Sequence, residues 1–136
     1  MQQEIKQTWH FNQSPQEVWK YLTIPELLEQ WLGKTDFQPI AGHKFRFIGR
    51  QGSEIDCEVL EVKPFTKLSY SWQRTSAKDR KPFTSKVVWT LVPKEKGTEL
   101  QLVHDGFTAL EDFTAHNNGW TVIGNRFLEL LNTIKK

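Results

Sequence analysis

The C-terminal segment, residues 114–134, places its large apolar side chains along one face of a helix. They recur at intervals of three and four residues, at Trp120, Ile123, Gly124, Phe127, Leu128, Leu131 and Ile134. A stripe of this length and regularity is typical of an amphipathic helix that buries one face against another element. The rest of the chain therefore has to provide a surface that covers this helix.

Short alternating stretches between about residue 36 and residue 105 could provide that surface. They are separated by Gly, Pro and charged turns, and they lie at 45–48, 55–62, 68–72, 87–92 and 98–104. Near-consecutive strands of this kind favour an antiparallel meander. Residues 4–11 also alternate, with Ile5, Trp9 and Phe11 on one face, and predict a first strand.

Two short helices are expected between the first strand and the meander. Ser14 and Pro15 suit the N-cap and first positions of a helix, and Glu17 completes a capping box. Pro25 opens the second helix, which we expect to end at Gly33. The predicted class is α+β: a curved antiparallel sheet of six to seven strands, wrapped on the long C-terminal helix.

Composition narrows the function classes. The chain has 136 residues and a formal net charge of +2, which fits one domain spanning 1–136 and disfavours an electrostatic nucleic-acid binder. Cys57 is the single cysteine, so no intramolecular disulfide can form. Neither a signal peptide nor a membrane span is visible, and by default we expect a cytoplasmic protein, either monomer or homodimer.

Aromatic residues are unusually frequent, at 12% with six Trp. They predict either an aromatic core or a lined cavity, and the sequence leaves both open. Gly124 raises the same question, because it interrupts the apolar stripe one turn after Trp120. The helix backbone approaches the sheet closely there, or space is kept for a ligand, or the glycine is simply tolerated. If space is kept, Gly124→Leu should fold.

The order of these segments resembles the helix-grip fold of the START-like, or Bet v 1-like (SRPBCC), superfamily. The motifs are more narrowly similar to the family named after the C-terminal domain of the heat shock protein 90 ATPase activator. They are the opening helices at 14–19 and 25–32, the Gly-containing strand start at 41–47, the hairpin formed by 57–64 and 68–72, the last strand at 97–107, and Gly119-Trp120 at the start of an apolar helix. The resemblance covers nearly the whole chain in the expected order.

The resemblance implies a hollow between helix and sheet, and with it a small intracellular protein that binds an apolar or amphipathic small molecule. The residues whose faces would line the hollow are Trp31, Phe45, Phe47, Tyr70, Trp72, Trp89, His104, Trp120 and Gly124. One alternative is a co-chaperone-like module that binds a chaperone or another protein. A third is a cyclase- or aromatase-type enzyme in which His104 and Tyr70 move protons.

No catalytic or cofactor-binding motif supports the hypothesis that the protein is an enzyme. The chain lacks G-x-S-x-G, G-x-x-x-x-G-K-[ST] and G-x-G-x-x-G, and its histidines form no metal-binding pair. We therefore expect no catalytic residue, no metal and no cofactor. Alternation aims His104 at the interior, where it is a ligand-bonding group or a base; the interpretation that we favour instead places it at the strand end, near solvent and bonded to backbone. Cys57 is expected to be a buried filler.

Overall fold

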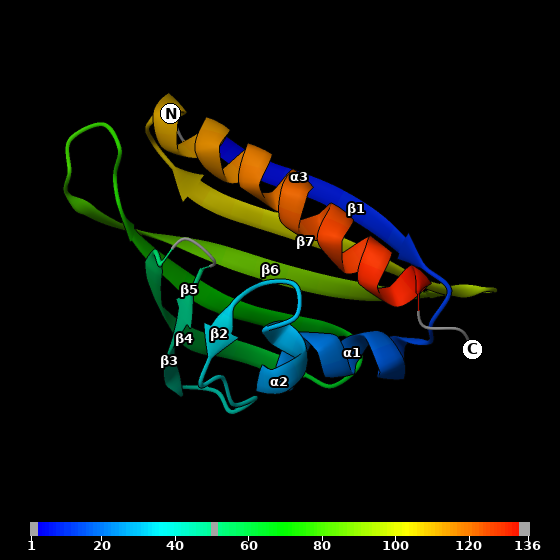
Figure 1. Ribbon diagram of the computed structural model, residues 1–136. Helices are drawn as coiled ribbons and strands as arrows, with labels where there is room; N and C mark the ends of the chain where they lie inside the picture. Colours follow the sequence, from blue (N-terminus) through cyan, green and yellow to red (C-terminus); the bar gives the residue numbers. More distant parts are fainter. Residues whose placement is uncertain (1–2, 50–51, 134–136) are drawn as a thin grey trace.

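The computed structural model describes residues 3–49 and 52–133 and confirms the α+β class. Seven strands form one curved antiparallel sheet in the order β1-β7-β6-β5-β4-β3-β2 (Figure 1). The elements are β1 Gln3–Phe11, α1 Pro15–Thr23, α2 Pro25–Leu28, β2 Lys34–Thr35, β3 Lys44–Ile48, β4 Glu54–Lys63, β5 Lys67–Thr75, β6 Pro82–Lys94, β7 Gly97–Phe107 and α3 Leu110–Asn132.

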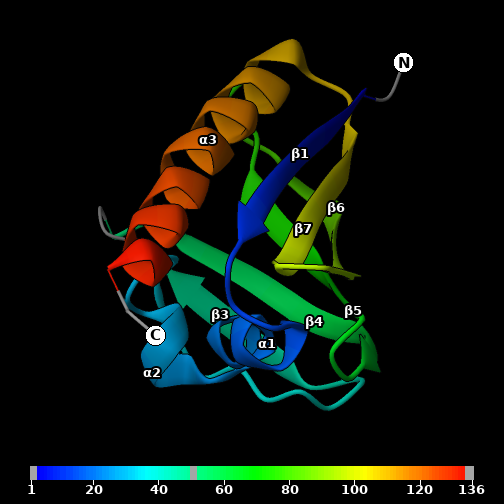
Figure 2. The same cartoon turned by 90° about the vertical axis from the view of Figure 1, so that its right-hand side faces the viewer.

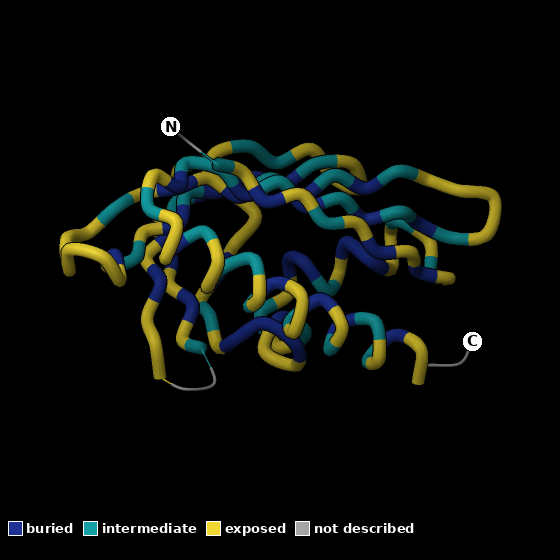
Figure 3. The backbone as a smooth tube through the Cα atoms, turned by 90° about the horizontal axis from the view of Figure 1, so that it is seen from above, coloured by how far each residue is buried: buried dark blue, intermediate teal, exposed yellow. Residues whose placement is uncertain are grey.

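The alternation read from the sequence sets the inner face of the sheet. Trp9 in β1 pairs with Leu100 in β7, and Leu102 in β7 pairs with Trp89 in β6; all four are buried. Residues between them are less buried, so the backbone in Figure 3 changes repeatedly between buried and exposed positions along the strands. The strands of the predicted meander are confirmed, and β6 is longer than expected at both ends.

The predicted helix start at Ser14 is confirmed. The Ser14 hydroxyl accepts a hydrogen bond from the Glu17 amide at 3.2 Å, and Pro15 is the first residue of α1. The predicted end of the second helix at Gly33 is wrong, because α2 ends at Leu28. The strand β2, which follows and pairs with β3, was not predicted. It has only two residues, too few to show an alternating pattern.

Helix α3 begins at Leu110, four residues before the predicted start, and extends to Asn132. Ile134, the last residue of the predicted apolar stripe, lies outside the described residues. It runs beside β1, at one side of the curved sheet, with α2 near its C-terminal end (Figures 1 and 2). The Gln7 side chain in β1 donates hydrogen bonds to the Asn117 carbonyl and to the Thr121 hydroxyl. These contacts fix the helix over the β1 edge.

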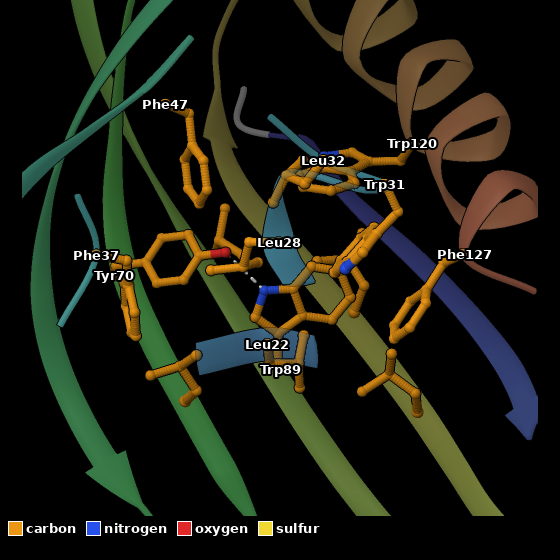
Figure 4. Packing of buried hydrophobic residues seen from close by; sticks show 14 of the residues in the cluster. Leu22, Leu28, Trp31, Leu32, Phe37, Phe47, Tyr70, Trp89, Trp120 and Phe127 are labelled. Atoms are coloured by element: carbon orange, nitrogen blue, oxygen red, sulfur yellow. Dashed lines mark hydrogen bonds between the residues drawn. The ribbon is translucent and has the colours of Figure 1, made fainter. Parts of the chain in front are cut away.

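Aromatic rings fill much of the space between the sheet and the helices. Trp31 stacks on Phe127 with centroids 4.1 Å apart and an interplanar angle of 11°. The Trp89 indole donates a hydrogen bond to the Tyr70 hydroxyl at 2.9 Å, drawn as a dashed line in Figure 4. Burial of these rings accounts for most of the unusual aromatic content without any ligand.

Candidate functional site

A cavity of about 440 Å³ lies between α3 and the β3–β5 part of the sheet. The sheet contributes Phe47, Ile55, Trp72 and Arg74 to its wall. The helix contributes Asp112, Ala115, His116, Gly119, Trp120, Val122, Ile123 and Arg126. Because α3 is held over β1, the helix leaves the opposite part of the curved sheet uncovered, and the cavity occupies that space.

Gly124 does not border this cavity. A Cβ atom placed on Gly124 would overlap the indole ring of Trp9, so the helix backbone lies directly against that ring. The expectation that Gly124 keeps space for a ligand is therefore wrong, and the close-approach alternative describes the structure. Glycine is required here because any side chain would push the helix away from β1.

Gly119, the other glycine of α3, faces open space. Nothing lies within 4 Å of a Cβ placed on Gly119, which lines the cavity together with Ala115 four residues earlier. Residues four apart share one helix face, so two small residues lie on the cavity side of the first half of α3. The small size of these two positions widens the cavity at this end.

Two buried polar atoms in the cavity wall have no hydrogen-bond partner among the described residues. They are Nε1 of Trp72 and Nε2 of His116; the third such atom, Oε1 of Gln13, belongs to a residue outside the wall. Trp72 as a whole is buried, with only 4% of its surface exposed. Buried polar groups are normally hydrogen-bonded, so each unsatisfied one requires an explanation.

His104 lies behind Trp120 and has both ring nitrogens occupied. Nδ1 accepts a hydrogen bond from the Trp120 indole at 2.9 Å, and Nε2 lies 2.7 Å from the Ser85 hydroxyl. Since Nδ1 accepts, Nε2 carries the proton and donates it to Ser85, which donates in turn to the Trp72 carbonyl at 3.1 Å. Burial, with a smaller contribution from His116, lowers the pKa of His104 to about 2.

The inward orientation that alternation indicated for His104 is confirmed, and the position near solvent that we favoured is wrong, since the residue is 0% exposed. Its partners are side chains rather than the backbone, which differs from the interpretation that we favoured. A neutral imidazole with both nitrogens bonded has no free lone pair for a substrate. The arrangement holds Trp120 and Trp72 in place and gives His104 no accessible position for proton transfer.

Asp112 ties the loop after β5 to the first turn of α3. Its carboxylate accepts hydrogen bonds from the Ser76 hydroxyl at 2.6 Å and from the Ala77 amide at 2.8 Å. The carboxylate also lies near the helix N-terminus, where negative charge is favourable. Arg74 and Arg126 add two guanidinium groups to the wall, so charged groups border an otherwise apolar cavity.

The structure separates the nine residues predicted to bind a ligand into three sets. Phe47, Trp72 and Trp120 line the cavity. Trp31, Phe45, Tyr70 and Trp89 are buried and are not among the lining residues, and Figure 4 shows Trp31, Tyr70 and Trp89 packed among other rings. His104 and Gly124 contact Trp120 and Trp9 instead of the cavity.

Sequence reasoning missed the polar part of the wall. His116 lies four residues before Trp120 on α3, and this spacing places it on the same helix face. We considered His116 only as a metal ligand and overlooked this signal. For Arg74 and Asp112 no sequence signal exists, because their place in the wall depends on how the loop at 76–81 meets the helix.

Other groups in the described residues suggest no chemistry. Cys57 is buried as expected, and burial raises the pKa of its thiol, which disfavours the reactive thiolate. Within residues 3–49 and 52–133, no group of three His, Cys, Asp or Glu side chains is placed to hold a metal ion. No helix of that same part of the chain has the length and apolar character needed to cross a bilayer.

Comparison with known families gives one match over most of the chain. Residues 12–132 match the model of a family described as Activator of Hsp90 ATPase homolog 1-like protein. Among proteins with curated descriptions, none matches the chain.

Solved structures agree with the architecture. The structure of a protein from Mesorhizobium loti is similar to this one with a TM-score of 0.91 and 31% sequence identity. The aligned region covers 98% of this chain and 100% of that protein. The structure of the Aha1 dimer from Colwellia psychrerythraea is similar with a TM-score of 0.80 and 19% sequence identity. The aligned region covers 95% of this chain and 96% of that chain. A protein of the dynemicin biosynthetic locus matches 96% of this chain over 47% of its own, at 22% identity and a TM-score of 0.84.

Proposed function

Because the chain belongs to the Activator of Hsp90 ATPase homolog 1-like family, whose fold binds ligands or partners, we propose that it binds an apolar or amphipathic small molecule in the cavity beneath α3. The observation that carries this proposal is the cavity itself. Its volume of about 440 Å³ falls within the range of roughly 300–1,000 Å³ that is usual for small-molecule sites.

The composition of the wall supports the same proposal. Phe47, Ile55, Trp72, Trp120 and Ile123 offer aromatic and aliphatic surface to a ligand. A few polar groups interrupt that surface, which is the usual composition of a site that orients a mostly apolar molecule. His104, the residue with the best claim to acid–base chemistry, is fully bonded. Binding without chemical conversion therefore fits the site better than catalysis.

Fluorescence of N-phenyl-1-naphthylamine, an uncharged apolar probe, tests this proposal. We expect the parent protein to bind it with a rise in probe emission and quenching of Trp emission. Gly119→Leu should fold and should lose most of this binding, because the new side chain extends into the cavity.

Asn125→Leu is the matched control for that substitution. Asn125 lies on the same helix, is exposed and is not among the cavity-lining residues. The same side chain added there should leave probe binding unchanged. If the parent protein binds no probe, or if both variants bind as the parent does, the cavity is not a binding site.

The family description favours a second candidate, interaction with a chaperone. The description names activation of the Hsp90 ATPase, and the relative from Colwellia psychrerythraea is a dimer. Measuring the ATPase rate of purified Hsp90 with and without this protein tests that candidate. Stimulation that survives Gly119→Leu would assign the activity to a surface other than the cavity.

A further inference from the structure

The two unpartnered polar atoms of the cavity wall define what a ligand should carry. Trp72 Nε1 and His116 Nε2 both belong to rings that line the cavity. Their ring centroids are 6.4 Å apart at an interplanar angle of 74°. Two hydrogen bonds through one shared oxygen join nitrogen atoms up to about 6 Å apart, which is comparable to the separation of these two rings.

The hydrogen bonds of His116 determine which role each nitrogen has. Nδ1 lies 2.8 Å from the Asp112 carbonyl oxygen, which can only accept a hydrogen bond, so Nδ1 carries the proton. In the neutral ring Nε2 is then an acceptor. Burial, aided by the charge of Arg74, lowers the pKa of His116 despite the opposing effect of Asp112, and the ring stays neutral at physiological pH.

Trp72 differs from the other deeply buried tryptophans in this respect. The indole N–H groups of Trp31, Trp89 and Trp120 donate to the Tyr21 carbonyl, the Tyr70 hydroxyl and His104, respectively. A buried indole N–H is normally paired in this way. The one indole N–H without a partner among these four belongs to a ring that lines the cavity, as does the imidazole acceptor that also lacks a partner.

Building on the proposed function, we propose that the cavity selects a neutral molecule with an apolar ring body and one hydroxyl group, a phenol or a cyclic alcohol. Trp72 Nε1–H donates a hydrogen bond to the hydroxyl oxygen, and the hydroxyl hydrogen is donated to His116 Nε2. A hydroxyl is the simplest group that both accepts and donates at one oxygen. A carboxylate or an ether satisfies Trp72 and leaves His116 unpaired.

The wall around this pair fits the ring body of such a molecule. Phe47 lies 5.8 Å from Trp72 between ring centroids, and Trp120 lies 5.3 Å from it. Ile55 and Ile123 supply aliphatic surface from the sheet and from the helix. A flat apolar body can contact these side chains while its hydroxyl lies between Trp72 and His116.

A matched series of probes tests the proposal on the unmodified protein at neutral pH. The probes are 2-naphthol, 2-methoxynaphthalene, 2-methylnaphthalene and 2-naphthoate, with affinities measured by titration calorimetry. We expect 2-naphthol to bind about tenfold more tightly than 2-methylnaphthalene, since the latter leaves both polar atoms unpaired. 2-Methoxynaphthalene accepts a hydrogen bond but donates none, so it should fall between them.

Two substitutions assign the two hydrogen bonds. His116→Phe keeps a ring and removes the acceptor, and it should remove the preference for 2-naphthol over 2-methoxynaphthalene. Trp72→Phe removes the donor and should reduce the preference of 2-methoxynaphthalene over 2-methylnaphthalene. Val122→Ala, an exposed wall position without polar atoms, should change all affinities by a similar factor and leave their ratios intact.

The outcomes separate this proposal from the one on which it rests. If none of the naphthalenes binds, the cavity is not a ligand site and both proposals fail. If 2-naphthol and 2-methylnaphthalene bind equally to the parent protein, the binding function stands and the hydroxyl proposal is overturned, since water then serves the two atoms. Tighter binding of 2-naphthoate than of 2-naphthol would overturn it as well, in favour of an anion paired with Arg74.

Discussion

The two long sides of α3 differ in how closely they meet the sheet. On the β1 side, Gly124 brings the helix backbone against the Trp9 ring, and Gln7 hydrogen-bonds to the helix at Asn117 and Thr121. On the β3–β5 side, Ala115 and Gly119 face a cavity. A straight helix cannot follow both sides of a curved sheet, so close packing on one side leaves a space on the other.

The comparison shows that the same residue type serves opposite purposes five residues apart. Gly124 is required because there is no room for a side chain, whereas Gly119 stands where a side chain would have room. Substitutions on the packed side and on the open side of α3 should therefore differ in their effects on stability.

Gly124→Leu should prevent folding or lower the free energy of unfolding by more than about 3 kcal/mol, because the new side chain overlaps Trp9 on the packed side. Gly119→Leu, on the open side, should change it by less than about 1 kcal/mol. Urea unfolding followed by circular dichroism measures both. Equal losses for the two variants would mean that the two sides do not differ.

Trp120→Ala should lower the free energy of unfolding by about 3–5 kcal/mol, because it removes a fully buried ring. The change also leaves Nδ1 of His104 without its donor. Trp120→Phe is the informative companion, since it keeps a ring and removes only the hydrogen bond. A loss below about 1 kcal/mol for Trp120→Ala in chemical denaturation would show that α3 is not docked through this residue.

Acidification should destabilise the protein through His104. The folded state keeps its imidazole neutral to about pH 2, whereas the unfolded chain binds a proton below about pH 6.5. The stabilising contribution is therefore complete above pH 6.5 and decreases as the pH falls, by about 1.4 kcal/mol per pH unit between pH 6 and pH 4.

His104→Gln tests that assignment. A glutamine amide can accept from Trp120 and donate to Ser85 but does not titrate, so this variant should show a shallower loss of stability between pH 6 and pH 5. His116, whose pKa is also lowered, accounts for the slope that remains. An unchanged slope would contradict the assignment to His104.

Gly119→Ala should raise the free energy of unfolding by about 1 kcal/mol, because alanine has the better helix propensity and nothing contacts the added methyl group. Thermal unfolding detects this as a higher midpoint. The same substitution at Gly124 should lower the midpoint, and this opposite sign is the most sensitive check of the contrast between the two sides.

Local patterns were sufficient to predict most of the fold. Alternation placed Ile5, Trp9 and Phe11 on the inner face of β1, and the capping residues placed the start of α1 at Ser14 and Pro15. Each of these inferences depends only on neighbouring residues. The end of α2 and the short strand β2 depend on tertiary contacts, and there the predictions failed.

The cavity wall was less predictable because it depends on the rotation and position of α3. Phe45 and Phe47 share one face of β3 and their rings are in contact, yet only Phe47 lines the cavity. Gly124 lies on the apolar stripe of α3 and Gly119 does not, but the stripe alone does not show whether a glycine meets a ring or open space. That difference depends on the position of the helix over the sheet, which no local pattern fixes.

The buried tryptophans have a photophysical consequence. Trp89 lies 6.3 Å from Trp9, 6.0 Å from Trp31 and 5.5 Å from Trp120, and Trp120 lies 5.3 Å from Trp72. Indole rings at such separations exchange excitation energy, so light absorbed by any one of them migrates through the group. Quenching at Trp72, one of the rings that line the cavity, therefore lowers emission from rings that the quencher does not touch, so intrinsic fluorescence is a sensitive assay for the binding proposed above.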